Sequence, residues 1–402
     1  MSPRPSNASA AAGPAAPPAA SRLARVAPFL AMDVLSVARA KARQGADIVH
    51  MEVGQPSAPT PRRALEAARA ALAHGGIGYT EALGMPSLRE RIARHYRETY
   101  GVSVDPEQVI VTTGSSGGFL LAFLAAFDAG ARIACACPGY PAYRNIFSAL
   151  DMHTVDVRLG DNRGWELTVD GIASAAQEQP LHGVLAMSPS NPTGAVAGAA
   201  GLEAIGAFCR ERGLWFISDE IYHGLHYGAP ATTALACAPE AIVVNSFSKY
   251  YCMTGWRIGW LVVPPRLTRA IERLAQNLFI SAPYPSQVAA EAAFDARDEL
   301  EEVRAGYARN RDIVLNALAD LNLPHAPCDG AFYAYVDISG HAADSAAFCR
   351  ALLDAEGLAI TPGADFDPHE GDRFVRLSFA GATGACREGM ARLKRFLTRG
   401  GA

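Results

Sequence analysis

Short apolar runs alternate with longer amphipathic segments through the middle of this chain. Seven of the apolar runs have the length and composition of β-strands, and they cover residues 109–114, 132–137, 153–159, 183–188, 214–219, 241–246 and 258–264. Segments with helical periodicity lie between several of them, for example residues 117–130 and 201–213. This alternation predicts an α/β fold with a mostly parallel seven-stranded sheet covered by helices on both faces.

Both ends of the chain show a different pattern. Residues 28–45 predict a helix that ends at Gly45, and residues 47–56 predict a short strand followed by a turn. Residues 300–321 predict a long helix, and strands and a helix after it indicate a smaller α+β domain. We therefore predict a tail, an N-terminal segment that joins the small domain, a large domain and the small C-terminal domain, with the limits 1–22, 23–66, 67–300 and 301–402.

The composition narrows the classes of partner. About half of the 402 residues are hydrophobic, which is enough for a large core. The net charge is −4 and the basic residues are dispersed, so we expect neither nucleic acid nor an anionic membrane as a partner. No apolar run approaches the roughly 18 residues that a membrane span needs. Small molecules and further copies of the chain are the expected partners.

The N-terminal residues and the cysteines indicate the cellular compartment of the protein. Residues 1–22 consist mainly of Ala, Pro, Ser and Gly, which predicts a disordered tail, and its prolines interrupt any secretory signal. The eight cysteines are scattered without a CxxC pair, so we expect reduced thiols and no metal site. These features favour a cytoplasmic protein.

Polar residues directly follow five of the predicted strands. In a parallel sheet, ligands bind at the carboxyl ends of the strands, so these residues are the candidates for a functional site. The five sequences are TTGSSGG at 112–118, CPGYPAY at 137–143, SPSNPTG at 188–194, SDEIYHG at 218–224 and SFSKYY at 246–251.

The glycine-rich segment at 113–118 leads from a strand into an apolar helix. Free N–H groups at a helix N-terminus can bind a phosphate, although a plain glycine turn is an equally good interpretation of this segment alone. It lacks the lysine of a Walker A loop and the full GxGxxG spacing. A nicotinamide dehydrogenase would need a strand followed by GxGxxG, so this alternative is not supported.

Lys249 and Asp219 are the strongest candidates for chemistry. Lys249 has Ser246, Ser248 and Arg257 close by in sequence, and this group suits an anion of high charge. Cationic neighbours and partial burial would lower the pKa of the lysine and make its amine a nucleophile. Asp219 follows an apolar run, where it could cap a turn or pair with a cationic ring nitrogen.

Three motifs in a fixed order indicate a family. They are SNPTG at 190–194, DEIY at 219–222, and S-x-S-K-x-x-x-M-x-G-x-R at 246–257. Together they resemble the class I and II aminotransferases, which are pyridoxal-phosphate enzymes of fold-type I. The resemblance extends from about residue 28 to the C-terminus, and it implies a large domain that binds pyridoxal phosphate.

The resemblance implies a role for each matching residue. Lys249 would bind pyridoxal phosphate covalently, and Asp219 would pair with its pyridine nitrogen. Tyr222 and Asn191 would form hydrogen bonds with the ring hydroxyl, and Tyr140 would stack on the ring. The phosphate would be held by Ser115, Ser116, Gly117, Ser246, Ser248 and Arg257.

Three further residues concern the substrate and a second subunit. Arg376 in RFVRLSFA would bind the α-carboxylate of the substrate, to which Asn191 also contributes, although a strand arginine can simply be exposed. Gly54 in EVGQP would leave room beside the same carboxylate. Tyr79 in YTEALGMPSLR would reach the phosphate of the neighbouring subunit, which implies a homodimer with shared active sites.

The implied activity is the transfer of an amino group from an L-amino acid to a 2-oxo acid such as 2-oxoglutarate or pyruvate, by a ping-pong mechanism in which Lys249 is also the general base. Residues 114–118 lack the lysine found near this point in some aspartate-using relatives, and no cation can be assigned to a distal acid. A neutral or aromatic amino acid is therefore favoured.

Two alternatives share the cofactor. Related enzymes of the same fold catalyse β-elimination or the synthesis of aminocyclopropane carboxylate, and the residues above hardly distinguish these reactions from transamination. A second alternative is a non-catalytic binding module, because bacterial regulators carry a similar domain behind a DNA-binding segment. Only about 27 residues precede the matching region here, which leaves no room for a winged helix.

Overall fold

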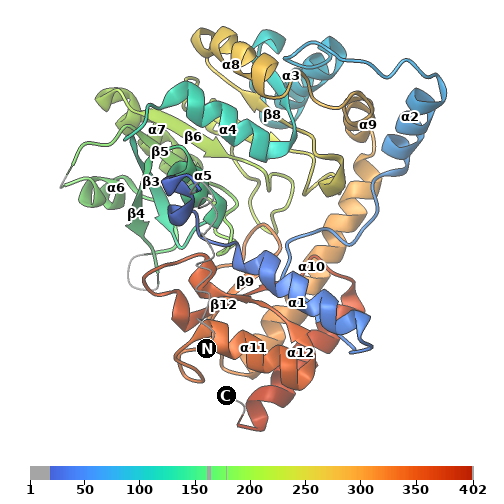
Figure 1. Cartoon of the computed structure of the whole chain (residues 1–402), viewed down its shortest axis with the longest axis vertical. Coiled ribbons are helices and arrows are strands. Elements are labelled where there is room, and N and C mark those ends of the chain that lie inside the picture. The colour runs from blue at the N-terminus through green and yellow to red at the C-terminus, as the bar shows by residue number, and fades with distance from the viewer. Residues whose placement is uncertain (1–18, 161–163, 178, 401–402) are drawn as a thin grey trace, which may run out of the picture.

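The computed structural model describes residues 19–160, 164–177 and 179–400. A seven-stranded sheet lies at the centre of the larger part of the molecule (Figure 1), with the strand order β2-β8-β7-β6-β5-β3-β4. The strands are β2 (Val109–Thr112), β3 (Arg132–Cys137), β4 (His153–Arg158), β5 (Gly183–Met187), β6 (Trp215–Asp219), β7 (Ile242–Ser246) and β8 (Gly259–Val262). Each predicted strand is confirmed. The sheet is mostly parallel, because only β8 runs against its neighbours.

Helices cover both faces of this sheet. The helices of this larger part are α2 (Arg62–Ala73), α3 (Pro86–Tyr100), α4 (Gly114–Ala126), α5 (Pro141–Ala149), α6 (Val169–Ala175), α7 (Ala199–Arg212), α8 (Pro265–Leu278) and α9 (Tyr284–Ala293). Among them, α2 packs against α9 and not on the sheet (Figure 1). Successive strand residues enter two different cores. Val243 belongs to one hydrophobic cluster, whereas Ile242 and Val244 belong to the other. This arrangement explains why the strands are apolar at nearly every position.

A smaller part of the molecule contains the C-terminal elements and the N-terminal helix. Its antiparallel sheet has the order β11-β12-β9 and lies beside three long helices. These elements are β9 (Tyr333–Asp337), β11 (Thr361–Pro362), β12 (Phe374–Ser378), α10 (Arg297–Asp320), α11 (Ser345–Glu356) and α12 (Thr383–Thr398). α1 (Leu30–Arg43) lies along this part in Figure 1, and β1 (Val49–His50) pairs in parallel with β10 (Leu358–Ala359).

The predicted N-terminal tail overlaps the described residues at positions 19–22. Residues 1–18 lie outside the described residues. The predicted tail extends too far, because Ser21–Arg25 form a short 3₁₀ helix. Arg25 pairs with Asp151, and Arg22 Nη1 lies 3.6 Å from the same carboxylate, so ion pairs fix a segment whose composition alone indicated disorder. Within the described part of the chain, no helix is long and apolar enough to cross a membrane.

Candidate active site

A cavity of about 240 Å³ lies at the carboxyl ends of the parallel strands. Most of the residues predicted from the sequence line it, although they come from distant segments. The predicted residues in the lining are Gly54, Ser115, Ser116, Tyr140, Asn191, Asp219, Tyr222, Ser248, Lys249, Arg257 and Arg376. The fold therefore brings together groups that were identified separately at the ends of different strands.

Lys249 follows β7 directly and projects into the cavity. Its ammonium group donates a hydrogen bond to the backbone carbonyl of Gly54 at 2.8 Å. Burial lowers the pKa of Lys249 to about 8, and the charges of Arg376 and Arg257 act in the same direction. A neutral amine is therefore available near physiological pH, as a nucleophile for a carbonyl requires.

Asp219 is the last residue of β6 and is almost fully buried. One carboxylate oxygen accepts the backbone N–H of Ile221 at 3.0 Å, and the other accepts the hydroxyl of Tyr143. Burial raises the pKa of Asp219 to about 7, against the opposing effects of these hydrogen bonds and of Lys249. A carboxylate placed in this way suits a protonated ring nitrogen, because a nearby positive charge would compensate its desolvation.

The N-terminus of α4 forms the other polar end of the cavity. Thr113 precedes this helix without capping it through its side chain, and the first turn has no acidic residue. Ser115, Ser116 and Arg257 line the cavity beside it. A Cβ atom at Gly114 would lie 2.6 Å from Nη2 of Arg257, so glycine leaves room for the guanidinium group. Unpaired helix N–H groups, hydroxyls and an arginine make a suitable site for a phosphate.

Three of the predicted cofactor residues do not line this cavity. Ser246 lies behind it, where its hydroxyl is 2.9 Å from that of Ser248 and accepts the backbone N–H of Ser248 at 3.1 Å. Gly117 faces Thr113 within α4. Tyr79 is 82% exposed and does not line the cavity. Ser246 can therefore support Ser248, while the role predicted for Tyr79 stays a prediction.

Arg376 defines the opposite end of the cavity. Its side chain is buried on β12, which excludes the alternative of an exposed strand arginine. Nη1 donates to Oδ1 of Asn191 at 2.9 Å, and Nη2 donates to the backbone carbonyl of Glu52 at 2.6 Å. The guanidinium group lies between the rings of Tyr333 and Phe366, 4.3 and 4.6 Å from their centroids. This planar cation is fixed in an orientation that suits a carboxylate.

Tyr333 and Tyr143 are polar residues of the site that the sequence reasoning missed. The hydroxyl groups of Tyr333 and Tyr222 are 2.7 Å apart. A Cβ atom at position 54 would lie only 1.6 Å from the hydroxyl of Tyr333, so Gly54 is required by this close packing. Tyr143 could have been found from its position three residues after Tyr140, on the first turn of α5.

An apolar wall completes the substrate end. It is formed by Phe29, Ala31, Met32 and Val53. Two further apolar residues of the lining lie beside Asp219, because Met187 ends β5 and Ile221 follows β6. The first turn of α1 supplies part of this wall, although Phe29 at its N-cap position cannot cap the helix. The carboxylate of Asp365 caps it instead, accepting the backbone N–H groups of Leu30 at 2.9 Å and Ala31 at 3.1 Å. The small sheet and the N-terminal helix are thus joined directly at the substrate end.

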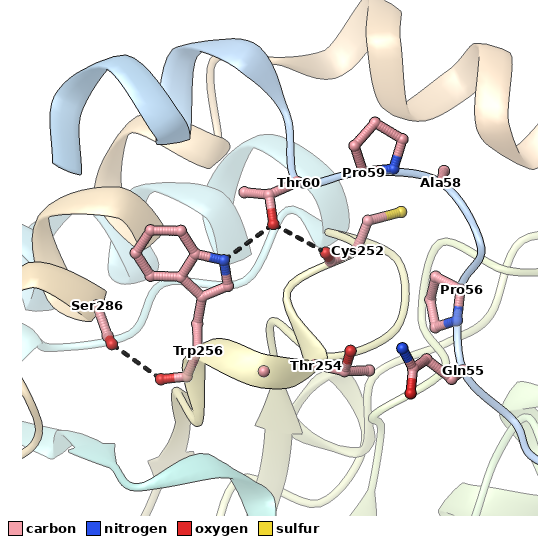
Figure 2. Close-up of a pocket in the computed structure, with 10 residues that line it drawn as sticks. Gln55, Pro56, Ala58, Pro59, Thr60, Cys252, Thr254, Trp256 and Ser286 are labelled. Atoms are coloured by element: carbon pink, nitrogen blue, oxygen red, sulfur yellow. Dashed lines mark hydrogen bonds between the residues drawn. The ribbon is translucent and has the colours of Figure 1, made fainter. Parts of the chain in front are cut away.

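A second, more open pocket of about 440 Å³ adjoins the cavity, and Gln55 and Thr254 line both. Figure 2 shows that it lies between the N-terminal segment and the turn that separates Lys249 from Arg257. The indole of Trp256 donates to the hydroxyl of Thr60 at 2.9 Å, and the hydroxyl of Ser286 donates to the carbonyl of Trp256 at 2.8 Å (Figure 2). These bonds fix the turn and hence the spacing of the two cations.

Comparison with known proteins identifies the family. The model of the family described as aminotransferase class I and II matches residues 46–393. The chain therefore belongs to the class I and II aminotransferases. These enzymes depend on pyridoxal phosphate, and the cavity described above has groups that fit the ring nitrogen, the ring face and the phosphate of this cofactor.

Individual relatives agree with this assignment. The valine–pyruvate aminotransferase of Mycobacterium tuberculosis is 48% identical over 379 residues, which cover 93% of this chain and 97% of the relative. The crystal structure of an aminotransferase from Mycobacterium tuberculosis has a TM-score of 0.93 and 47% identity, covering 96% of this chain and 100% of that one. The aspartate aminotransferase of Thermus thermophilus with maleate has a TM-score of 0.89 and 32% identity, with coverages of 94% and 100%. The fold is that of fold-type I, and the protein is an aminotransferase.

Proposed function

We propose that this aminotransferase transfers the amino group of an apolar L-amino acid such as valine to pyruvate. The observation that carries the proposal is the charge distribution of the cavity. The only cationic side chains in its described lining are those of Lys249, Arg257 and Arg376. Each is already proposed to bind either the cofactor or the α-carboxylate of the substrate. The remaining wall around the substrate end is apolar. The similarity to a valine–pyruvate aminotransferase supports the same conclusion.

The lack of a further cation disfavours dicarboxylic substrates. A second carboxylate on aspartate, glutamate or 2-oxoglutarate would lie against Phe29, Met32 or Val53. Met32 is 49% exposed, so such a carboxylate would keep part of its hydration. A charge left without a partner in this setting costs about 1–3 kcal/mol, which corresponds to a factor of about 5 to 150 in binding. Valine and pyruvate avoid this cost, because the carboxylate that they carry can pair with Arg376.

The residues of the cavity divide the work of the reaction. Bound pyridoxal phosphate supplies an electron sink for the bond that breaks at the substrate Cα. Arg376 orients the substrate through its α-carboxylate, and Asp219 keeps a proton on the ring nitrogen. Lys249, once its amine is free and neutral, takes the proton from Cα as the general base. The 2-oxo acid product would leave before the acceptor binds to the same groups, which gives ping-pong kinetics.

The test is a panel of amino donors and acceptors with the purified holoenzyme. We expect kcat/KM for valine, leucine or isoleucine with pyruvate to exceed the values for aspartate, and for 2-oxoglutarate as acceptor, by at least about 10-fold. Double-reciprocal plots should give parallel lines. Efficient use of aspartate would contradict the proposed specificity. Release of ammonia and pyruvate from a β-substituted amino acid, without stable transamination, would favour a β-lyase.

We also propose that the enzyme is a homodimer in which Tyr79 completes the phosphate site of the partner. The segments around Tyr79 and Ile280 lie side by side, because Thr80 N donates to Ser281 Oγ at 3.3 Å. Both segments expose large apolar side chains, namely Leu72, Ile77, Tyr79, Leu278 and Ile280. An exposed apolar patch of this kind suits self-association.

A complementation experiment tests the shared site. Lys249→Ala and Tyr79→Ala subunits are each defective, but a mixed dimer would contain one site with neither defect. Unfolding and refolding the two variants together should therefore restore part of the activity. No restoration, in mixtures that form mixed dimers by mass spectrometry, would show that Tyr79 acts within its own subunit or not at all.

A further inference from the structure

A second cluster of reactive side chains lies outside the active-site cavity. Cys137 ends β3, Asp156 lies on the neighbouring strand β4, and His369 belongs to the loop between β11 and β12. Each side chain offers one metal-ligating atom, and the three atoms all lie within 4.8 Å of one another. The segments that carry them are far apart in the sequence, which explains why the sequence analysis expected no metal site.

Hydrogen bonds already hold this cluster in place. Nε2 of His369 lies 3.0 Å from Oδ2 of Asp156. The thiol of Cys137 donates to Oδ1 of Asp367 at 3.3 Å, and the same oxygen accepts the backbone N–H of His369 at 2.7 Å. Asp367 therefore positions both Cys137 and the loop of His369. Outer groups of this kind orient metal ligands in known sites.

The types of donor indicate which metal would bind. A thiolate sulfur and an imidazole nitrogen favour a borderline or soft cation, and a carboxylate oxygen is compatible with it. Mg²⁺ and Ca²⁺ prefer oxygen alone. Cys137 is buried, whereas the side chain of His369 is 41% exposed, so a cation could enter from the solvent side. We propose that Cys137, Asp156 and His369 form a binding site for Zn²⁺, with Asp367 holding the loop of His369 in place through the backbone N–H of His369.

Arg144 is a cation that opposes this assignment. Its Nη2 lies 3.5 Å from Oδ1 of Asp156, so it occupies part of the space around that carboxylate. The contact is long, however, and Oδ1 of Asp156 has no hydrogen-bond partner. The side chain of Arg144 is 30% exposed and can turn toward solvent. The thiolate of Cys137 and the carboxylate of Asp156 would together balance the charge of Zn²⁺.

The position of the cluster indicates how a bound metal ion would affect the enzyme. It joins the edge of the large sheet to the loop that follows β11. In the same region, the backbone N–H of Gly139 donates to the carbonyl of Phe366 at 3.1 Å, and the ring of Phe366 packs against Arg376. Tyr140 follows Gly139 directly and lines the cavity. Bound Zn²⁺ would fasten the two parts together beside the substrate end and slow any movement between them during turnover.

Metal binding to the holoenzyme tests the site directly. Zn²⁺ is added in the absence of amino acids, the bound metal is counted after dialysis, and its surroundings are measured by X-ray absorption. We expect one Zn²⁺ per chain, with one sulfur ligand at about 2.3 Å. His369→Asn and Cys137→Ser should weaken binding at least tenfold, and Asp367→Asn by about 10- to 100-fold. Cys209→Ser, which changes a buried thiol on α7 away from the cluster, should bind like the wild type.

Two results would overturn the proposal. One is the absence of a bound Zn²⁺ with a sulfur ligand in the wild type. The other is undiminished binding by His369→Asn, whose surface substitution should not disturb folding. Inhibition adds a second readout, because Zn²⁺ should slow valine–pyruvate turnover less in His369→Asn than in Cys209→Ser. Equal inhibition of the two variants would show that Zn²⁺ acts elsewhere.

Discussion

The two ends of the active-site cavity are built in different ways. The cofactor end is formed by residues at the ends of neighbouring strands of one sheet, such as Asp219 on β6 and Lys249 after β7. The substrate end combines α1, the segment around Val53 and β12. There, Arg376 donates to the carbonyl of Glu52, a residue 324 positions earlier in the sequence.

Because of this difference, we expect the cofactor end to determine the chemical step and the substrate end to determine which substrate is accepted. The sheet fixes the cofactor end through regular backbone pairing, so its groups keep one geometry whatever the substrate. The substrate end depends on contacts between the first and the last parts of the chain, above all on Asp365 and Arg376. We therefore expect changes at the cofactor end to stop turnover, and changes at the substrate end to alter KM and the choice of substrate.

The largest effect should come from removing the amine at the cofactor end. Lys249→Ala loses the nucleophile and the general base together, so kcat should fall by at least about 10⁴-fold. Pyridoxal phosphate should still bind, because Arg257 and the N-terminus of α4 are unchanged. Borohydride should then no longer attach the cofactor to the chain, as followed by mass spectrometry. Lys394→Ala, at an exposed position, is the matched control, and appreciable turnover by Lys249→Ala would refute the assignment.

A change at Arg376 should be smaller and should depend on the substrate. Lys at this position keeps the charge but loses two parallel N–H donors, each worth about 1.5–3 kcal/mol in a bond to a charged group. We expect kcat/KM for valine to fall by about 10² to 10³-fold. Amines that lack a carboxylate are the internal comparison, because their slow reaction should not change. An equal loss for both kinds of amine would indicate general misfolding of the substrate end.

The fraction of Lys249 that carries a neutral amine should depend on pH. It should rise about 100-fold between pH 6 and its plateau at higher pH. Its pKa is lowered to about 8, so the neutral amine increases tenfold per pH unit below this value and levels off above it. An exposed lysine, with a pKa of about 10.4, would continue to gain neutral amine up to about pH 10. The pH profile of each lysine can be measured by labelling. The apoprotein is treated with pyridoxal and then borohydride, and the labelled lysines are identified by peptide mapping.

Lys41 and Lys394, the other lysines of the chain, serve as internal standards in the labelling experiment. If all lysines show the same pH profile, the lowered pKa of Lys249 is wrong. Arg257→Gln should move the profile of Lys249 to higher pH, because one of the neighbouring positive charges is lost.

The smallest effect should come from Asp365, which touches neither substrate nor cofactor. Asp365→Ala removes the cap of α1, and such losses cost about 0.5–2 kcal/mol. Because α1 positions Phe29 and Met32, we expect kcat/KM for valine to fall about 2- to 30-fold with an unchanged cofactor spectrum. Asp33→Ala changes an exposed acidic residue in the first turn of the same helix and is the control. Equal effects of the two substitutions would exclude a specific role for the cap.

The sequence by itself determined the large sheet and most of the cofactor end. All seven strands were predictable because each is a short apolar run bounded by turns, and burial on both faces leaves a local signal. Asp219 and Lys249 were predictable because they directly follow such runs. The family motifs added the roles of their neighbours, since those motifs have fixed positions within one continuous region.

Only the tertiary structure decided which side chains complete the site. The contact of Tyr143 with Asp219, that of Tyr333 with Gly54, and the cap that Asp365 gives to α1 each join residues far apart in the chain. Local sequence patterns carry no information about such contacts, because periodicity identifies the buried face of an element and not the element that packs against it. For the same reason the cluster of Cys137, Asp156 and His369 became visible only when the chain was folded.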